Sequence, residues 1–454
     1  MTERRGDTLL FHTPPVIAAQ AAVGGKKESD GPLAAGFDEL TTDNRLGQCS
    51  WEAAEKQLQL RAARLCLQKA SLPAERVDLA LTGDLQAQCT ASGYALRELG
   101  VPFAGLFGAC STMAEALALG AALCSSGAAQ NLLAMTSSHF CAAERQFRTP
   151  LSYGAVRTPT AQWTATAAGC CLLRPAGQGV GIAAATLGRV QDYNIKDINN
   201  MGAAMAPAAA ATLLHYLADT HAELRDFDCI YTGDLGLVGS QMLRELLAAE
   251  GLLLKNHADC GCLLYDAEEQ RVKSGGSGAG CCAAVLCGHI LPKLLRRGSR
   301  RVLFIATGAL MSQTTFLQKE SIPAVAHLVE LTAPEKESCN ELSVGIFNRR
   351  RHLRGGAAVH RPDKADPGTH PHRLCGGGGG ALGGGAVCAA GRVCRCGGER
   401  APAGLRASAG KGGAHRRGGK GCHRHPDRRA DCCFCGHHRK PCLRRGVQPC
   451  GQKP

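Results

Sequence analysis

One cysteine lies where an apolar loop passes into a stretch typical of a helix. In GLFGACSTMAEALALG, residues 105–120, Cys110 is followed by Ser111, Thr112 and a run of small and apolar residues. A cysteine at the start of a helix lies at the positive end of the helix dipole, which favours the thiolate. Cys110 is therefore a candidate nucleophile. The same helix start, at Cys110 and Ser111, offers backbone N–H groups to an anionic ligand.

A short repeat places two acidic side chains at strand ends. VDLALTGDLQ (77–86) recurs as FDCIYTGDLG (227–236), which aligns Asp84 with Asp234. Each copy fits a strand, a turn and a following helix, so the repeat suggests a duplicated half-domain. Two unrelated strands that each end in a helix-capping Asp are the alternative. Asp84 and Asp234 are candidate contacts for a ligand or for calcium. Helix capping is the better explanation for each, because two carboxylates supply too few oxygen ligands for a calcium site.

The remaining candidates lie close to these segments. His139 follows a strand-like run and could approach Cys110, and Ser277 lies in the glycine-rich turn GGSGAG. An anionic ligand would need cations. Three basic side chains are candidates, and each is as readily a solvated surface charge: Arg145, Arg148 and Lys319.

The elements that would position these residues alternate along the chain. Apolar runs of strand length follow helical patterns, which predicts an α/β protein. Ser50 is the expected N-cap of a helix that reaches Ala70. Six runs are predicted to be strands: 77–85, 131–139, 169–175, 228–236, 260–266 and 301–310. Long helices rich in small residues are expected at 112–126, 203–218 and 278–296.

Charge and cysteine content differ sharply between the body and the tail. Residues 348–454 contain 23 Lys and Arg against 5 Asp and Glu, whereas the first 347 residues contain 29 against 33. The overall charge of +14 therefore gives no reason to expect a nucleic-acid partner.

Adjacent cysteines at 170–171 and 281–282 suit buried reduced thiols. No apolar run is long enough for a signal peptide or a membrane span, so we expect a cytosolic body.

The composition of the tail is too poor in apolar residues to form a hydrophobic core. Residues 348–454 contain 24 Gly and no Ile, Met, Trp or Tyr. CHRH (422–425) and CCFCGHH (432–438) invite a zinc interpretation, but regular ligand spacing around a small apolar core is missing. Such a composition is typical of a GC-rich gene read out of frame. We therefore expect a disordered segment over 334–454 and no metal site.

Motifs spread along the body carry a family resemblance: GPLAAGFDEL, LGQCSWEAAE, GLFGACSTMAEALAL, SSHFCAAERQFRTP, PTAQWTATAAG, NMGAAMAPAA, GGSGAGCCAAVLCGHIL and IATGALMSQTTFLQKESIPAVAH. Together they resemble the stage V sporulation protein AD family, from about residue 8 to 331. The resemblance implies a thiolase-like, duplicated αβαβα fold with halves at 1–176 and 177–333. It also implies sporulation, with binding of dipicolinic acid and calcium for uptake into the forespore. The location would be peripheral at the inner spore membrane, beside membrane proteins of the same operon.

The same resemblance makes catalysis doubtful. Condensing enzymes of the thiolase fold pair their cysteine with a histidine and with a second His or Asn. The corresponding turns here resemble YTGDLG, with Asp234, and GGSGAG, with Ser277. The leading hypothesis is a ligand-binding protein without a cofactor, whose pocket both halves close. The alternative is an acyltransferase or condensing enzyme that uses Cys110. A homodimer is expected only by analogy with the fold.

Overall fold

The computed structural model describes residues 2–147 and 157–334. Five strands of the first half form a sheet in the order β6-β5-β7-β9-β3, in which β5 is parallel to β6 and β7, and β9 is antiparallel to β7 and β3. The bounds are β3 (Val16–Gly24), β5 (Leu79–Gly83), β6 (Phe103–Gly105), β7 (Leu132–Ser138) and β9 (Ala167–Arg174).

The second half repeats this topology. Its strands follow the order β12-β11-β14-β15-β10, again with three parallel strands and then two antiparallel ones. The bounds are β10 (Val180–Thr186), β11 (Cys229–Thr232), β12 (His257–Asp259), β14 (Arg301–Ala309) and β15 (Ala324–Thr332). Counted within each half, both orders are third, second, fourth, fifth, first. The TGD repeat therefore belongs to a real duplication, and β3 joins the halves by pairing with β10.

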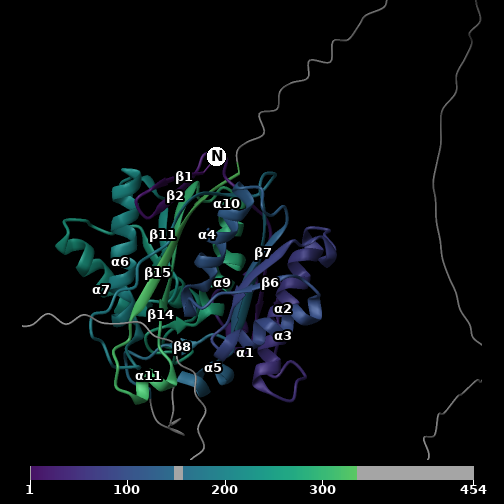
Figure 1. Cartoon of the computed structure of the whole chain (residues 1–454). Helices are drawn as coiled ribbons and strands as arrows, with labels where there is room; N and C mark the ends of the chain where they lie inside the picture. Colours follow the sequence, from purple (N-terminus) through teal and green to yellow (C-terminus); the bar gives the residue numbers. More distant parts are fainter. Residues whose placement is uncertain (1, 148–156, 335–454) are drawn as a thin grey trace, which may run out of the picture. The chain divides into compact units, whose positions relative to one another are not determined.

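Helices form three layers around the strands (Figure 1). Helices α2 (Trp51–Lys69) and α3 (Thr90–Leu99) cover the outer face of the first half, and α6 (Met201–Thr220) and α7 (Gly236–Ala249) that of the second. The central layer holds α4 (Thr112–Ser125) and α9 (Ala279–Val285), and α4 packs against strands of both halves. This is the expected αβαβα arrangement.

Shorter elements complete the described chain. The remaining strands are β1 (Thr2–Arg5), β2 (Thr8–Phe11), β4 (Glu39–Leu40), β8 (Trp163–Thr164) and β13 (Gly276–Ser277). The remaining helices are α1 (Lys26–Ser29), α5 (Phe140–Phe147), α8 (Cys260–Leu264), α10 (Leu291–Leu295) and α11 (Gln313–Leu317). Short 3₁₀ turns include η4 (Ala109–Ser111), and a π-helical turn, η6 (Leu286–Ile290), joins α9 to α10.

Local signals explain where several elements begin. Ser50 caps α2 as expected, since its side chain accepts a hydrogen bond from the Ala53 N–H. The prediction of a strand over 260–266 is wrong. Asp259 accepts a hydrogen bond from the Cys262 N–H and starts the short helix α8 instead. In the described chain α6 has the length and composition of a membrane span, but 67% of its apolar window is buried inside the protein, as in a core helix.

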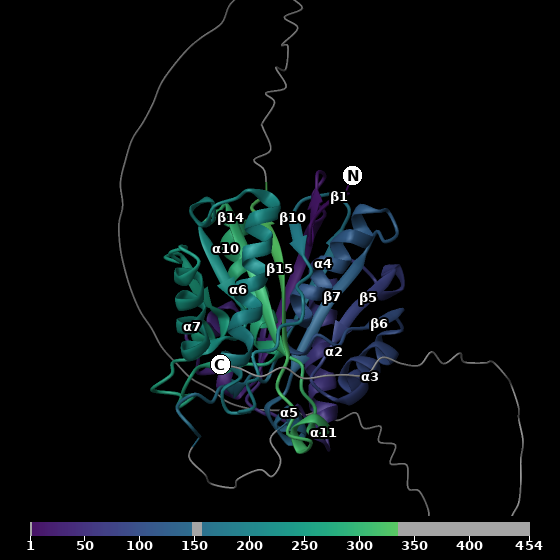
Figure 2. The same ribbon diagram turned by 60° about the vertical axis from the view of Figure 1, so that its left-hand side comes forward.

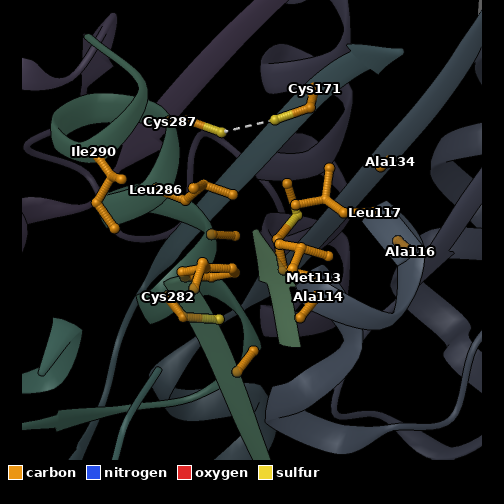
Figure 3. Packing of buried hydrophobic residues seen from close by; sticks show 14 of the residues in the cluster. Met113, Ala114, Ala116, Leu117, Ala134, Cys171, Cys282, Leu286, Cys287 and Ile290 are labelled. Atoms are coloured by element: carbon orange, nitrogen blue, oxygen red, sulfur yellow. Dashed lines mark hydrogen bonds between the residues drawn. The ribbon is translucent and has the colours of Figure 1, made fainter. Parts of the chain in front are cut away.

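Adjacent cysteines in β9 face two different layers. The Cys171 sulfur lies 3.6 Å from that of Cys287 in the central layer. Figure 3 shows the two thiols directed toward each other, at one end of a core cluster that includes Leu117 and Leu286. Cys170 is hydrogen-bonded to Cys66 of α2. All four thiols are buried and free, and so are Cys281 and Cys282, which confirms the expectation of buried reduced thiols at 170–171 and 281–282.

The proposed division between the halves, 176/177, lies in the turn between β9 and β10. Both halves belong to one compact unit. The predictions for the tail concern residues outside the described part of the chain, apart from residue 334.

Candidate functional site

A cavity at the carboxyl ends of the strands brings both halves together around Cys110. It contains about 510 Å³ of space, part of it open to solvent. Apolar side chains form most of its wall, and few polar groups reach it, as in ligand pockets. The lining residues are Leu85, Ala109, Cys110, Glu144, Thr164, Met201, Met205, Ser277, Gly278, Ala309 and Met311.

Cys110 is held on a tight turn just before α4. Ala109 has a φ of 51°, a left-handed conformation that an L side chain rarely adopts. Strand β14 fits closely against this turn, because a Cβ on Gly308 would lie only 2.2 Å from the Gly108 oxygen. The Cys110 carbonyl accepts a hydrogen bond from the Cys282 thiol at 3.5 Å. Contacts from the second half therefore hold this turn of the first half in place.

Burial and the neighbouring Asp234 together raise the pKa of Cys110. The Asp234 carboxylate accepts hydrogen bonds from the Thr307 hydroxyl (2.8 Å), the Ser277 hydroxyl (2.8 Å) and the Gly278 N–H (3.1 Å). Burial raises the pKa of Asp234 to about 6, against these hydrogen bonds. Burial first, and then the charge and hydrogen bonding of Asp234, raise the pKa of Cys110 well above its usual range. The helix dipole alone favours a thiolate, but the burial and the neighbouring acid favour the thiol.

The structure therefore brings Cys110, Asp234 and Ser277 together. Ser277 lies in the cavity wall, and its hydroxyl is directed to Asp234. Asp234 does not cap the helix that follows it. That role belongs to Asp259, which accepts hydrogen bonds from the N–H groups of Leu235 and Gly236.

Asp84, the repeat partner of Asp234, does not line this cavity. Its carboxylate accepts the N–H groups of Gln86 (2.9 Å) and Ser92 (2.8 Å), together with the Ser92 hydroxyl. This is the capping role expected for it. Asp84 does line an outer groove that shares Leu85, Ala109, Ala309 and Met311 with the cavity.

His139 also lies away from the cavity lining, so the expected approach to Cys110 is not seen. Its ring is buried, and Nε2 lies 2.8 Å from the Asn44 carbonyl oxygen. The ring packs against Trp51 with centroids 5.4 Å apart. Burial lowers the pKa of His139. These contacts are those of a core histidine.

The remaining predicted ligand contacts are scattered. The Ser111 side chain is buried and donates to the Gly108 carbonyl at 2.6 Å, so it does not face the cavity. Arg145 lines the outer groove and is ion-paired with Glu52. Lys319 is exposed beyond α11 and lines neither space. Arg148 lies outside the described residues.

One acidic residue of the cavity wall, Glu144, was not predicted from the sequence. Glu144 is buried, accepts a hydrogen bond from the Thr164 hydroxyl at 2.9 Å, and lies 3.3 Å from a guanidinium nitrogen of Arg157. The helical pattern of the segment around Glu144 gives no sign that it faces inward. Three methionines in the lining, Met201, Met205 and Met311, were also missed. Among the described residues, the lining holds no lysine or arginine, and no group of three or more His, Cys, Asp or Glu is placed to hold a metal.

Comparison with known proteins decides the family. Residues 5–332 match stage V sporulation protein AD. The chain belongs to this family. It is 42% identical over 321 residues to the stage V sporulation protein AD of Bacillus subtilis strain 168, covering 70% of this chain and 95% of that protein.

Two solved structures with a similar fold come from other families. The 3-oxoacyl-[acyl-carrier-protein] synthase III of Aquifex aeolicus VF5 is 14% identical with a TM-score of 0.45, over 70% of this chain and 99% of that chain. Acetamide-bound OleA of Xanthomonas campestris is 12% identical with a TM-score of 0.47, over 71% of this chain and 99% of that chain.

Proposed function

We propose that this protein binds dipicolinic acid for its uptake into the developing spore and performs no chemistry on it. One observation carries the non-catalytic part of the proposal. A buried carboxyl group, Asp234, adjoins Cys110 where a condensing enzyme needs a base that accepts the thiol proton and leaves a reactive thiolate. The negative charge of an ionised Asp234 instead opposes ionisation of the thiol.

The ligand would lie in the cavity with its flat ring between the methionine side chains. Met201, Met205 and Met311 offer an apolar, adaptable wall for a planar ring. One carboxylate would lie at the start of α4, where backbone N–H groups and the helix dipole favour an anion. The outer groove, where Arg145 lies, would receive the second carboxylate.

Calcium fits the proposal as part of the ligand. Glu144 in the wall and Asp234 behind it would repel a free dianion. A calcium ion bound between the ligand's own carboxylates lowers that repulsion, and carboxylate oxygens are the ligands that calcium prefers. Dipicolinate should therefore bind more tightly in the presence of calcium than in its absence.

The biological setting is proposed from the family. The protein would act peripherally at the inner spore membrane, together with membrane proteins encoded in the same operon.

Calorimetric titration with dipicolinate tests the site. Ala309 lies in the wall shared by the cavity and the groove, so Ala309→Leu fills that space and should weaken binding at least tenfold. Ala249→Leu is the matched control, since it makes the same change at the exposed end of α7. Cys110→Ala should weaken binding only a few-fold, because a thiol contributes packing rather than charge. Unchanged binding by Ala309→Leu would show that the site lies elsewhere.

The alternative, an acyltransferase, makes a different prediction. An acyl-coenzyme A would then acylate Cys110, and mass spectrometry would detect a label that Cys110→Ala removes. If the protein only binds its ligand, no acyl label forms on Cys110.

A further inference from the structure

The end of the second half-sheet that lies opposite the cavity carries a group of basic side chains. Strands β11, β12 and β14 are parallel, so their amino-terminal ends lie side by side. The segments that precede these strands, 224–228, 251–256 and 296–300, therefore meet at one edge of the protein. Two backbone hydrogen bonds confirm this, from Asp228 N to Arg301 O and from Ile230 N to Asn256 O. In both views α10, which leads into this edge, and α11 lie at opposite ends of the protein (Figures 1 and 2).

Basic side chains outnumber acidic ones at this edge. The three segments contain five basic residues, Arg225, Lys255, Arg296, Arg297 and Arg300, against two acidic residues, Asp226 and Asp228. Two further acids, Glu223 and Glu250, directly precede the first two segments, and Glu223 is ion-paired with Arg225. Both aspartate side chains accept hydrogen bonds from backbone N–H groups. Asp228 accepts them from Arg300 and Arg301, and Asp226 accepts one from Glu223. Burial, together with the nearby charges of Lys293 and Arg296, lowers the pKa of His289 beside this edge. The local charge is positive although the body as a whole is mildly acidic.

Two exposed leucines lie among these cations. Leu253 is 68% exposed and Leu295 is 40% exposed. Between the strands' ends, Arg297 and Arg300 line an open hollow with Ala333 and Pro334. Arg297 takes a left-handed conformation, with a φ of 58°, at the turn that displays it. We call this set, Leu253, Lys255, Leu295, Arg296, Arg297 and Arg300, the basic edge.

We propose that the basic edge docks the protein onto a bilayer of anionic phospholipids. Arginine binds phosphate with its fork of N–H donors, and an exposed leucine gains by entering the boundary between headgroups and acyl chains. Each basic residue near an anionic surface raises the membrane-binding constant about fivefold. The edge lies at the far end of β14 from Ala309, about 30 Å away for a nine-residue strand, so a docked protein keeps the cavity facing the water.

The proposal refines the peripheral location proposed above and does not depend on the identity of the ligand. A tryptophan introduced at Leu253 of the full chain reports contact with acyl chains through quenching by brominated lipids. We expect quenching in Leu253→Trp with vesicles of phosphatidylglycerol and brominated phosphatidylcholine at physiological salt. Leu317→Trp is the matched control, because Leu317 is 70% exposed on α11 at the other end of the protein and should not be quenched.

Charge reversal gives the second part of the test. In the Leu253→Trp background, R296E/R297E/R300E should lower vesicle binding, read from the introduced tryptophan, by about a hundredfold or more. K26E/R64E/R97E makes the same charge change at exposed residues elsewhere and should leave the quenching unchanged. Dipicolinate titration of both triple variants should match that of the parent, which separates this proposal from the proposed function.

Two results would overturn the proposal. One is vesicle binding by Leu253→Trp without quenching of the introduced tryptophan, which would mean attachment through another surface, such as the basic tail or an acidic protein partner. The other is equal quenching of the two triple variants, which would mean that the arginines of the basic edge do not contribute.

Discussion

Asp84 and Asp234 follow the same residues, Thr and Gly, at equivalent strand ends, yet their carboxylates have different surroundings. The Asp84 carboxylate accepts hydrogen bonds within its own loop and helix, from Gln86 and Ser92. Asp234 turns to Thr307 and Ser277, more than forty residues away in sequence. Sequence could therefore identify Cys110, Asp234 and Ser277 as candidates, through the turns that carry them. It could not show which aspartate faces the cavity, because residues distant in the chain decide that.

Replacing Asp234 tests its effect on the cysteine. Asp234→Asn removes the negative charge beside Cys110 and should lower the pKa of that thiol. Alkylation of Cys110 at pH 7.5, followed by peptide mass spectrometry, should then become roughly tenfold faster for each unit by which the pKa falls. Asp84→Asn makes the same change in the sister turn and should leave the Cys110 rate unchanged. Equal rates for Asp234→Asn and the parent would refute the electrostatic role of Asp234.

Prediction at the level of elements succeeded where a pattern was long or the signal was local. The helices expected at 112–126 and 203–218 are α4 and α6, shifted by two residues or fewer. The helix expected at 278–296 corresponds to α9, η6 and α10 in succession. The strand prediction for 260–266 was wrong because a short apolar run is compatible with a buried helix as well as with a strand. There the deciding contact is a cap from Asp259, at the end of β12.

A buried acid links three elements of the first half and should make stability depend on pH. Glu55 of α2 accepts hydrogen bonds from Gln86 after β5 (2.7 Å) and from Ser137 of β7 (3.0 Å). Burial and the charge of Asp84 raise the pKa of Glu55 to about 8. A folded-state pKa above the unfolded value gives stability that is complete below about pH 4.5 and is lost as the pH rises through about 8.

We therefore expect the free energy of unfolding to fall by about 2 kcal/mol between pH 6 and pH 8, with Glu55 as a principal cause. Glu55→Gln keeps the shape of the side chain and removes the titration, so its stability should vary less over that range. Urea unfolding at several pH values measures this. Glu98→Gln, at an exposed ion-paired glutamate, should retain the decline of the parent. The same decline in Glu55→Gln would contradict the assignment.

The edge strand β6 offers a surface for a second copy of the chain. Pro102 and Leu106 direct backbone groups toward β5, so by alternation those of Phe103 and Gly105 point away from the sheet. Phe103 is 42% and Phe107 is 66% exposed beside this open edge. An antiparallel pairing of two β6 strands would satisfy these groups around a twofold axis and cover the aromatic rings.

We accordingly predict a homodimer through β6 at micromolar concentration. Phe103→Asp places like charges on both sides of the twofold axis and should yield a monomer in sedimentation velocity. Leu317→Asp makes a comparable change at an exposed site on α11 and should stay dimeric. A parent protein that is monomeric at these concentrations would rule out the interface.

The molecule as a whole depends on a helical layer that neither half can complete alone. Helix α4, from the first half, packs on β14 and β15 of the second, and α9, from the second half, packs on β7 and β9 of the first. Glu28 likewise crosses between the halves, since its buried carboxylate accepts the Tyr265 hydroxyl and the Thr166 N–H. The sequence repeat predicted the duplication. The exchange of central helices depends on packing over more than a hundred residues, which no local pattern reports.

Expression of residues 1–176 tests this mutual dependence. Without α9 and η6, the inner face of β9 would lose the contacts that Gly169 makes with Ala283 and Cys171 with Cys287, and α4 would lose its contacts with the second half. The fragment should therefore be insoluble or unfold without a cooperative transition in calorimetry, since a layer covered on one side buries too little apolar surface. Co-expression with residues 177–454 is the control, because the cut lies in the turn between β9 and β10 and leaves every strand and helix whole. The two fragments should copurify and melt together. A soluble 1–176 fragment with a sharp melting transition would mean that the first half folds by itself and that the central layer forms only afterwards.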